Sequence, residues 1–224
     1  MRHLILGDAK GFLTMFIRKK RHRSGNIGVI VVEKIGGKMK ELVTIGVAYN
    51  EDEVENLVNE AKNSIMEKQT RYSELLSQIE VFANADDNAI SVLANCAAVM
   101  KMLFPKEYFW VGFYIVEGGE LILGPFQGTP ACTRIKFGRG VCGTAWKEQR
   151  TLVIEDVEKF PGHIACSSLS RSEIVVPLKH DGAVVGEIDI DSTQLSTFDN
   201  EDRIYLEHAA EMIAPYMAKL AIPL

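Results

Sequence analysis

The chain contains the stretch Ile174-Val-Val-Pro-Leu-Lys-His-Asp-Gly-Ala-Val-Val-Gly-Glu-Ile-Asp-Ile-Asp191, and its pattern indicates the class of fold. Two runs rich in β-branched residues, Ile174 to Leu178 and Ala183 to Asp191, are typical of strands. The segment His180-Asp-Gly182 between them is typical of a tight turn. The stretch therefore predicts an antiparallel hairpin.

Further strands and helices are expected on both sides of this hairpin. Runs of β-branched and aromatic residues predict strands, and apolar residues at helical spacing predict amphipathic helices. The expected strands lie at 109–116, 121–123 and 151–154, and the expected helices lie around 75–79, at 90–103 and at 199–217. Helices at both ends of mostly antiparallel strands favour an α+β fold, with a central sheet and helices on one face.

Composition and charge exclude several classes of protein. The chain has 224 residues, 47% of them hydrophobic and 25% charged, as in an average globular protein. Its net charge of -5 gives no overall case for binding nucleic acid or an anionic membrane. No apolar run reaches the roughly 18 residues that a membrane-spanning helix needs. The N-terminus also lacks a signal-peptide pattern, so a cytoplasmic location is expected.

The N-terminal part differs from the rest, and we expect a domain boundary near residue 66. The first domain, 1–65, is then an extension, and 66–224 is the main domain. Strands are expected at 27–32 and 42–48, with a turn at Gly36-Gly37-Lys38 and a helix after Asn50. This ββα extension is too small for a sizeable core of its own. Its basic run, Arg18-Lys-Lys-Arg-His-Arg23, is expected to be a solvated or disordered arm, and a contact with nucleic acid is the alternative.

Three of the four cysteines lie in glycine-rich, polar segments. Cys132, Cys142 and Cys166 suggest redox chemistry at a pocket, because cysteines of a reducing compartment stay thiols unless a disulfide is transient and catalytic. Taken alone, each could equally be a packing residue, and for Cys142 the two interpretations stay open. Cys96 lies on an apolar helix and is expected in the core. The spacing matches no usual zinc pattern, although His163 and Cys166 have ligand spacing, so no metal is expected.

Acidic and aromatic residues also share strand faces. Asp189 and Asp191 are two residues apart and project from the same face. A solvated face is the usual reading, but two close carboxyl groups also raise the pKa of one of them, which suits a proton donor. Trp110 and Tyr114, four residues apart, likewise share a face and are more often core residues than pocket residues.

Seven motifs in order make the region from about 66 to 220 resemble the free methionine-(R)-sulfoxide reductases, which have the GAF fold. The motifs are Phe109-Trp-Val-Gly-Phe-Tyr114, Leu123-Gly-Pro-Phe-Gln-Gly128, Ala131-Cys-Thr-Arg134, Phe137-Gly-Arg-Gly-Val-Cys-Gly-Thr-Ala145, Phe160-Pro-Gly-His-Ile-Ala-Cys166, Ser170-Arg-Ser-Glu-Ile-Val-Val-Pro177 and Ile188-Asp-Ile-Asp-Ser192. General GAF domains share the fold but lack this cysteine set.

The resemblance implies reduction of free methionine (R)-sulfoxide, with no cofactor and with thioredoxin as the electron donor. It implies Cys166 as the nucleophile, Cys132 as the resolving thiol and Cys142 as an auxiliary or alternative resolving thiol. The implied substrate contacts are Trp110, Tyr114, Glu173, Asp189 and Asp191. A homodimer is also expected, because GAF-fold proteins commonly pair through terminal helices. The alternatives are a GAF sensor that binds a small ligand without turnover and a protein that binds nucleic acid through its N-terminal arm.

Three further features of the sequence add to these expectations. The family usually has an acidic residue directly after the nucleophile, where this chain has Ser167, so the loop or the cysteine reactivity is expected to differ there. The stretch Arg18–Ile65 weakly resembles the N-terminal segment of insertion-sequence transposases. The segment Gly138-Arg-Gly-Val-Cys-Gly143 lacks the phosphate-loop pattern, and we expect it to lead into a helix whose N-terminus binds an anion such as the substrate carboxylate.

Overall fold

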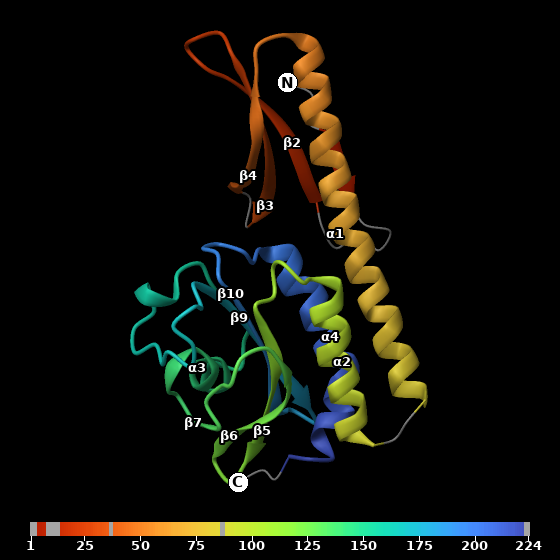
Figure 1. Cartoon of the computed structure of the whole chain (residues 1–224), viewed down its shortest axis with the longest axis vertical. Coiled ribbons are helices and arrows are strands. Elements are labelled where there is room, and N and C mark those ends of the chain that lie inside the picture. The colour runs from red at the N-terminus through yellow and green to blue at the C-terminus, as the bar shows by residue number, and fades with distance from the viewer. Residues whose placement is uncertain (1–3, 8–13, 36–37, 86–87, 222–224) are drawn as a thin grey trace. The chain divides into compact units, whose positions relative to one another are not determined.

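The computed structural model describes residues 4–7, 14–35, 38–85 and 88–221 (Figure 1). The chain divides into two compact units, 1–72 (unit 1) and 73–224 (unit 2). The division falls inside one helix, α1, which runs from Glu51 to Ala85. The helices expected separately after Asn50 and around 75–79 are therefore continuous, because no glycine or proline interrupts the sequence between 51 and 85.

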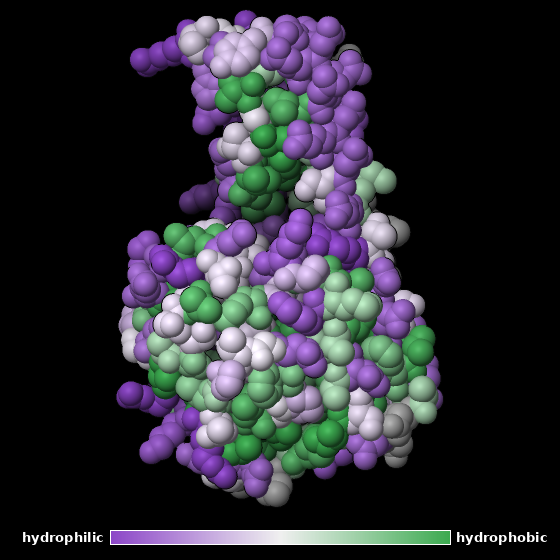
Figure 2. Space-filling model, in the orientation of Figure 1, coloured by the Kyte–Doolittle hydropathy of each residue, from purple (hydrophilic) through white to green (hydrophobic). Residues whose placement is uncertain are grey.

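Unit 1 is a four-stranded antiparallel sheet with the first part of α1 packed on one face. Its strands are β1 (Leu4–Gly7), β2 (Thr14–Arg21), β3 (Ile27–Ile35) and β4 (Lys38–Ala48), and they are ordered β1-β2-β3-β4. Its buried apolar core consists of Met15, Ile17, Val29, Val31, Ala48, Val54, Ala61 and Ile65. Figure 2 shows further apolar side chains over β3 and β4, where Val43 and Val47 are exposed.

The basic run of unit 1 is not a disordered arm. Arg18 to Arg21 form the end of β2 and pair with β3, with Arg18 opposite Ile30. Met15 and Ile17 alternate into the core from the same strand, but the charged residues that follow obscure this pattern in the sequence. The extension thus has four strands instead of the expected two. The expected turn at Gly36-Gly37-Lys38 lies largely outside the described residues.

Unit 2 is built on a six-stranded antiparallel sheet ordered β7-β6-β5-β10-β9-β8. Its strands are β5 (Trp110–Glu117), β6 (Glu120–Gln127), β7 (Arg134–Lys136), β8 (Leu152–Ile154), β9 (Ser172–His180) and β10 (Ala183–Ser192). Its helices are α2 (Ala89–Leu103), α3 (Gly140–Glu148) and α4 (Asn200–Ala218), with a 3₁₀ turn, η1, at Val157–Lys159. The prediction of an α+β fold with a central antiparallel sheet is confirmed.

The two faces of this sheet are covered differently. Helices α2 and α4 pack on one face, over buried residues such as Ile188 and Ile190 (Figure 1). The expected helices at 90–103 and 199–217 thus share one face, whereas the short helix α3 packs on the other face, over β9 and β10. Side chains of β10 alternate between the two faces, so Asp189 and Asp191 point to the side of α3. No helix of the described residues is long and apolar enough to cross a membrane.

Candidate active site

A disulfide joins two loops of unit 2 that are distant in sequence. Cys132 lies between β6 and β7, and Cys166 lies between η1 and β9. Their sulfur atoms are bonded, and their Cα atoms are 5.3 Å apart. The cysteines that the resemblance paired as nucleophile and resolving thiol are therefore within reach of each other.

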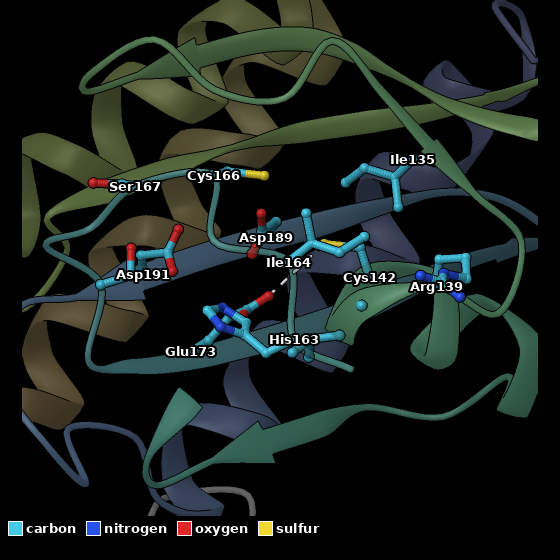
Figure 3. Close-up of a pocket in the computed structure, with 13 residues that line it drawn as sticks. Ile135, Arg139, Cys142, His163, Ile164, Cys166, Ser167, Glu173, Asp189 and Asp191 are labelled. Atoms are coloured by element: carbon cyan, nitrogen blue, oxygen red, sulfur yellow. Dashed lines mark hydrogen bonds between the residues drawn. The ribbon is translucent and has the colours of Figure 1, made fainter. Parts of the chain in front are cut away.

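The three predicted acids share one sheet face under these loops. Glu173 of β9 lies directly opposite Asp191 of β10. Asp189 lies two residues before Asp191 on the same face of β10. Glu173 and Asp189 are each only 6% exposed. Figure 3 shows all three carboxyl groups around one cavity together with Cys166 and Cys142.

Helix α3 brings the third cysteine to the same place. Cys142 lies in the first turn of α3, and its Sγ donates a hydrogen bond to Oε1 of Glu173 at 3.8 Å. The helix can start so close to β7 because residue 143 is glycine: a Cβ there would lie 2.4 Å from the carbonyl oxygen of Lys136. The helix predicted after Gly138 is confirmed, and Cys142 is both buried and part of the site.

The cavity between these elements has a volume of about 30 Å³. That space holds a water molecule or two, but not an amino acid. The lining side chains come from β7, from α3 and the residue before it, from the loop that carries Cys166 and from β9 and β10. They are Ile135, Arg139, Val141, Cys142, His163, Ile164, Cys166, Ser167, Ser170, Glu173, Asp189 and Asp191, with Gly140 at the helix start.

Trp110 and Tyr114 lie on the same sheet face but do not line this cavity. In the register between β5 and β10, Trp110 is opposite Asp191 and Tyr114 is opposite Glu187. The Trp110 indole lies over Gly112, where a Cβ would come within 2.6 Å of the ring. Trp110 Nε1 donates to the carbonyl of Thr129, and the Tyr114 hydroxyl donates to the carbonyl of Cys132, both at 2.9 Å. The two aromatic residues therefore support the loop that carries Cys132.

Burial and mutual repulsion favour the protonated forms of the acidic groups in the cluster. Burial, and then the charge of neighbouring carboxyl groups, raise the pKa of Glu173 and of Asp189 well above their usual values. The same two causes raise the pKa of the Cys142 thiol. Burial raises the pKa of Asp191 only to about 6, so this carboxyl is the most readily ionised of the three.

Three other residues belong to the site but were not singled out from the sequence. Glu187 is fully buried on β10 and lies on the same face as Asp189. The spacing of Glu187, Asp189 and Asp191 at every second residue is the signal in the sequence that places all three on one face. Ser170 is buried at the cavity wall. Arg139 precedes α3 and carries the one fixed positive charge among the described residues that line the cavity.

The residues next to Cys166 contribute a turn and a neutral imidazole. The Ser167 hydroxyl accepts a hydrogen bond from the backbone amide of Leu169 at 3.2 Å, which fixes the turn after Cys166. Burial lowers the pKa of His163, so its imidazole is neutral near pH 7. Arg171, considered from the sequence as a neighbour of Cys166, is not among the residues that line the cavity.

A disulfide-bonded cysteine pair lies over a group of buried carboxyls, on a six-stranded sheet flanked by helices. The GAF domain family matches residues 69–216, which agrees with the fold of unit 2. The protein is thus a GAF-domain protein.

Similar proteins narrow this class further. The free methionine-R-sulfoxide reductase of Saccharomyces cerevisiae is 39% identical over 158 residues, which cover 67% of this chain and 88% of that protein. The enzyme of the same name from Escherichia coli is 39% identical, over 68% of this chain and 92% of that protein. A crystal structure of free methionine-R-sulfoxide reductase from Neisseria meningitidis with its substrate is 50% identical, with a TM-score of 0.63, over 67% of this chain and 92% of that one. The chain belongs to the free methionine-R-sulfoxide reductase family.

Proposed function

We propose that this protein reduces free methionine (R)-sulfoxide to methionine by thiol chemistry and so recovers oxidised methionine. The observation that supports this most is the Cys132–Cys166 pair, which closes over a cavity lined by Glu173, Asp189 and Asp191. Sulfoxide reduction by a thiol needs these components: a nucleophilic sulfur, a second thiol and a proton donor. The names of the related enzymes agree with this assignment.

In the proposed reaction, the Cys166 thiolate attacks the sulfur of the sulfoxide. The oxygen passes to Cys166 as a proton is added, so that methionine leaves and Cys166 becomes a sulfenic acid. The Cys132 thiol then displaces water from the sulfenic acid and forms the disulfide. An external dithiol, for which we propose thioredoxin in the cytoplasm, reduces the disulfide by exchange. Cys142 takes no part in these reaction steps and is assigned as an auxiliary thiol.

The carboxyl groups divide the remaining tasks. Burial favours the protonated forms of Glu173 and Asp189, which we assign as the source of the proton for the sulfoxide oxygen. Asp191, whose pKa is about 6, is ionised at neutral pH and accepts the substrate ammonium. The substrate carboxylate is proposed to bind at the N-terminus of α3 beside Arg139, where backbone amides point outward. Trp110 and Tyr114 lie on the same sheet face beside the cavity and are proposed to contact the methionine side chain once the Cys166 loop has moved.

Substrate entry requires movement of the loop that carries Cys166. With the disulfide formed, the cavity of about 30 Å³ is too small for methionine sulfoxide. Cys166, Ser167 and Ile164 line the cavity from this one loop, so reduction of the disulfide frees the segment that covers the acids. We also propose that the enzyme works as a homodimer.

The activity is tested with the two sulfoxide epimers. The protein is incubated with thioredoxin, thioredoxin reductase and NADPH, and methionine release is measured separately for free (R)- and (S)-methionine sulfoxide. We expect turnover of the R epimer, with the S epimer slower by at least about 100-fold. In a fixed binding position, only one configuration at sulfur directs the sulfoxide oxygen toward the carboxyl groups. Ligand binding without turnover of either epimer would favour a sensor.

Unit 1 is not needed for this chemistry. No site residue lies in unit 1, and the GAF match begins at residue 69. A chain that starts at Met66 should therefore keep kcat/KM within about twofold of the full chain, as expected for changes far from a site. A truncated protein with a native circular dichroism spectrum but no activity would show that unit 1 is part of the enzyme.

A further inference from the structure

Three elements bring one thiol and two carboxyl groups together at the bottom of the cavity. Sγ of Cys142 on α3 and carboxyl oxygens of Glu173 on β9 and Asp189 on β10 all lie within 4.8 Å of one another, and all three residues are buried. We propose that this triad is a binding site for a thiophilic divalent cation, with Zn²⁺ as the best fit, and that the bound cation competes with substrate. Only the competition rests on the function proposed above.

The mixed donor set selects the class of cation. Zn²⁺ binds thiolates and carboxylates, and open sites have three protein ligands with water at the fourth position of a tetrahedron. Ca²⁺ and Mg²⁺ prefer oxygen ligands alone, so the Cys142 sulfur disfavours them. No zinc spacing is visible in the sequence, because the three ligands come from a helix and two strands that meet only in the fold.

The carboxyl groups of β10 provide a second indication that a cation belongs here, and Glu187 is the first of them. Its side chain is fully buried, and its carboxyl group interacts with the backbone amide of Trp146 but with no side-chain donor. Glu187 lies two residues before Asp189 on the same face of β10. Oδ1 of Asp189 is also sealed from solvent without a hydrogen-bond partner. In the described part of the chain, no lysine or arginine forms an ion pair with these acids, although buried carboxyls are normally paired or bound to metals.

The disulfide form of the protein offers both the ligands and the space. Cys142 is a free thiol while Cys132 and Cys166 are bonded. The cavity of about 30 Å³ accepts an ion and a water molecule without any opening of the loop. Binding exchanges the thiol proton of Cys142 for the metal, so a sulfur–metal bond forms and a proton leaves, with no oxidation or reduction.

The test uses the full chain in its disulfide form, so that Cys132 and Cys166 cannot bind the metal. Co²⁺ is titrated as a spectroscopic stand-in, and Zn²⁺ is then added to displace it. We expect a thiolate-to-cobalt charge-transfer band that Zn²⁺ removes at one equivalent. Cys142→Ser should abolish the band, and Glu187→Gln should weaken Zn²⁺ binding about 10-fold, the usual effect of changing a group beside the metal ligands. Cys96→Ala, which alters the other free cysteine, should leave the band unchanged.

Absence of the band in the wild-type protein, or its persistence in Cys142→Ser, would overturn the site. Should Cys142→Ser fail to fold by circular dichroism, Glu173→Gln takes its place and must weaken Zn²⁺ binding, or the site is wrong. With the reduced protein, Zn²⁺ should raise the apparent KM for methionine sulfoxide without lowering kcat. A cobalt band in a protein that does not reduce methionine sulfoxide would refute the proposed function and leave the metal site standing.

Discussion

Replacing Cys166 by serine should lower methionine formation by at least about 1,000-fold, the scale on which nucleophile removal acts in enzymes. A serine hydroxyl at this position neither ionises near neutral pH nor accepts the sulfoxide oxygen, so the first bond cannot form. The measurement is methionine release in a single turnover, with reduced protein in excess over the R epimer. Because no second thiol is needed at this stage, the result isolates the first chemical step.

Cys132→Ser is the matched variant for this experiment, because it removes the other half of the same disulfide. It should still release methionine in the first turnover and then stop with a sulfenic acid on Cys166, which dimedone labels. Cys96→Ala serves as a neutral control, since Cys96 is buried in α2 away from the cavity. A Cys166→Ser protein that matched the wild type in the first turnover would mean that another thiol is the nucleophile.

Asp189→Asn should lower kcat by about 100-fold or more, the usual contribution of a general acid. Asparagine has nearly the same shape as aspartic acid but cannot give up a proton to the sulfoxide oxygen. The measurement is steady-state reduction of the R epimer over a range of concentrations, so that kcat and KM are separated. A loss in kcat with little change in KM identifies proton transfer rather than binding.

Asp181 provides the control for the Asp189 experiment. It is an acid of the same hairpin, but its side chain is 93% exposed in the turn between β9 and β10. Asp181→Asn should therefore leave kcat and KM unchanged. Asparagine also accepts the positive φ of 50° at this position. Equal activities of Asp189→Asn and the wild type would remove Asp189 from the chemistry.

The fold of unit 2 was largely predictable because its signals are local. The β9–β10 hairpin follows from β-branched runs around an Asp-Gly turn, and both expected strands lie within the observed ones. Strand β2 was missed for a physical reason: Arg18 to Arg21 pair through their backbones, and their charged side chains hide the alternation that Met15 and Ile17 begin. The side of the sheet on which α3 packs depends on contacts with distant strands, which no local pattern contains.

The candidate site was only partly predictable from the residues. The two-residue spacing of Asp189 and Asp191 correctly placed both on one face, but their burial depends on α3 and the Cys166 loop, which lie elsewhere in the sequence. The pairing of Cys132 with Cys166 came from the family resemblance, because a separation of 34 residues indicates no contact by itself. Glu187 was overlooked since an acid in a strand usually faces solvent.

The measurement that addresses the whole account is a single turnover of reduced wild-type protein with free methionine (R)-sulfoxide and no other reductant. We expect one methionine for each chain, the loss of two thiols and a Cys132–Cys166 disulfide identified by peptide mapping. The S epimer should give neither product. No methionine from the R epimer, or methionine formed without loss of these two thiols, would contradict the account.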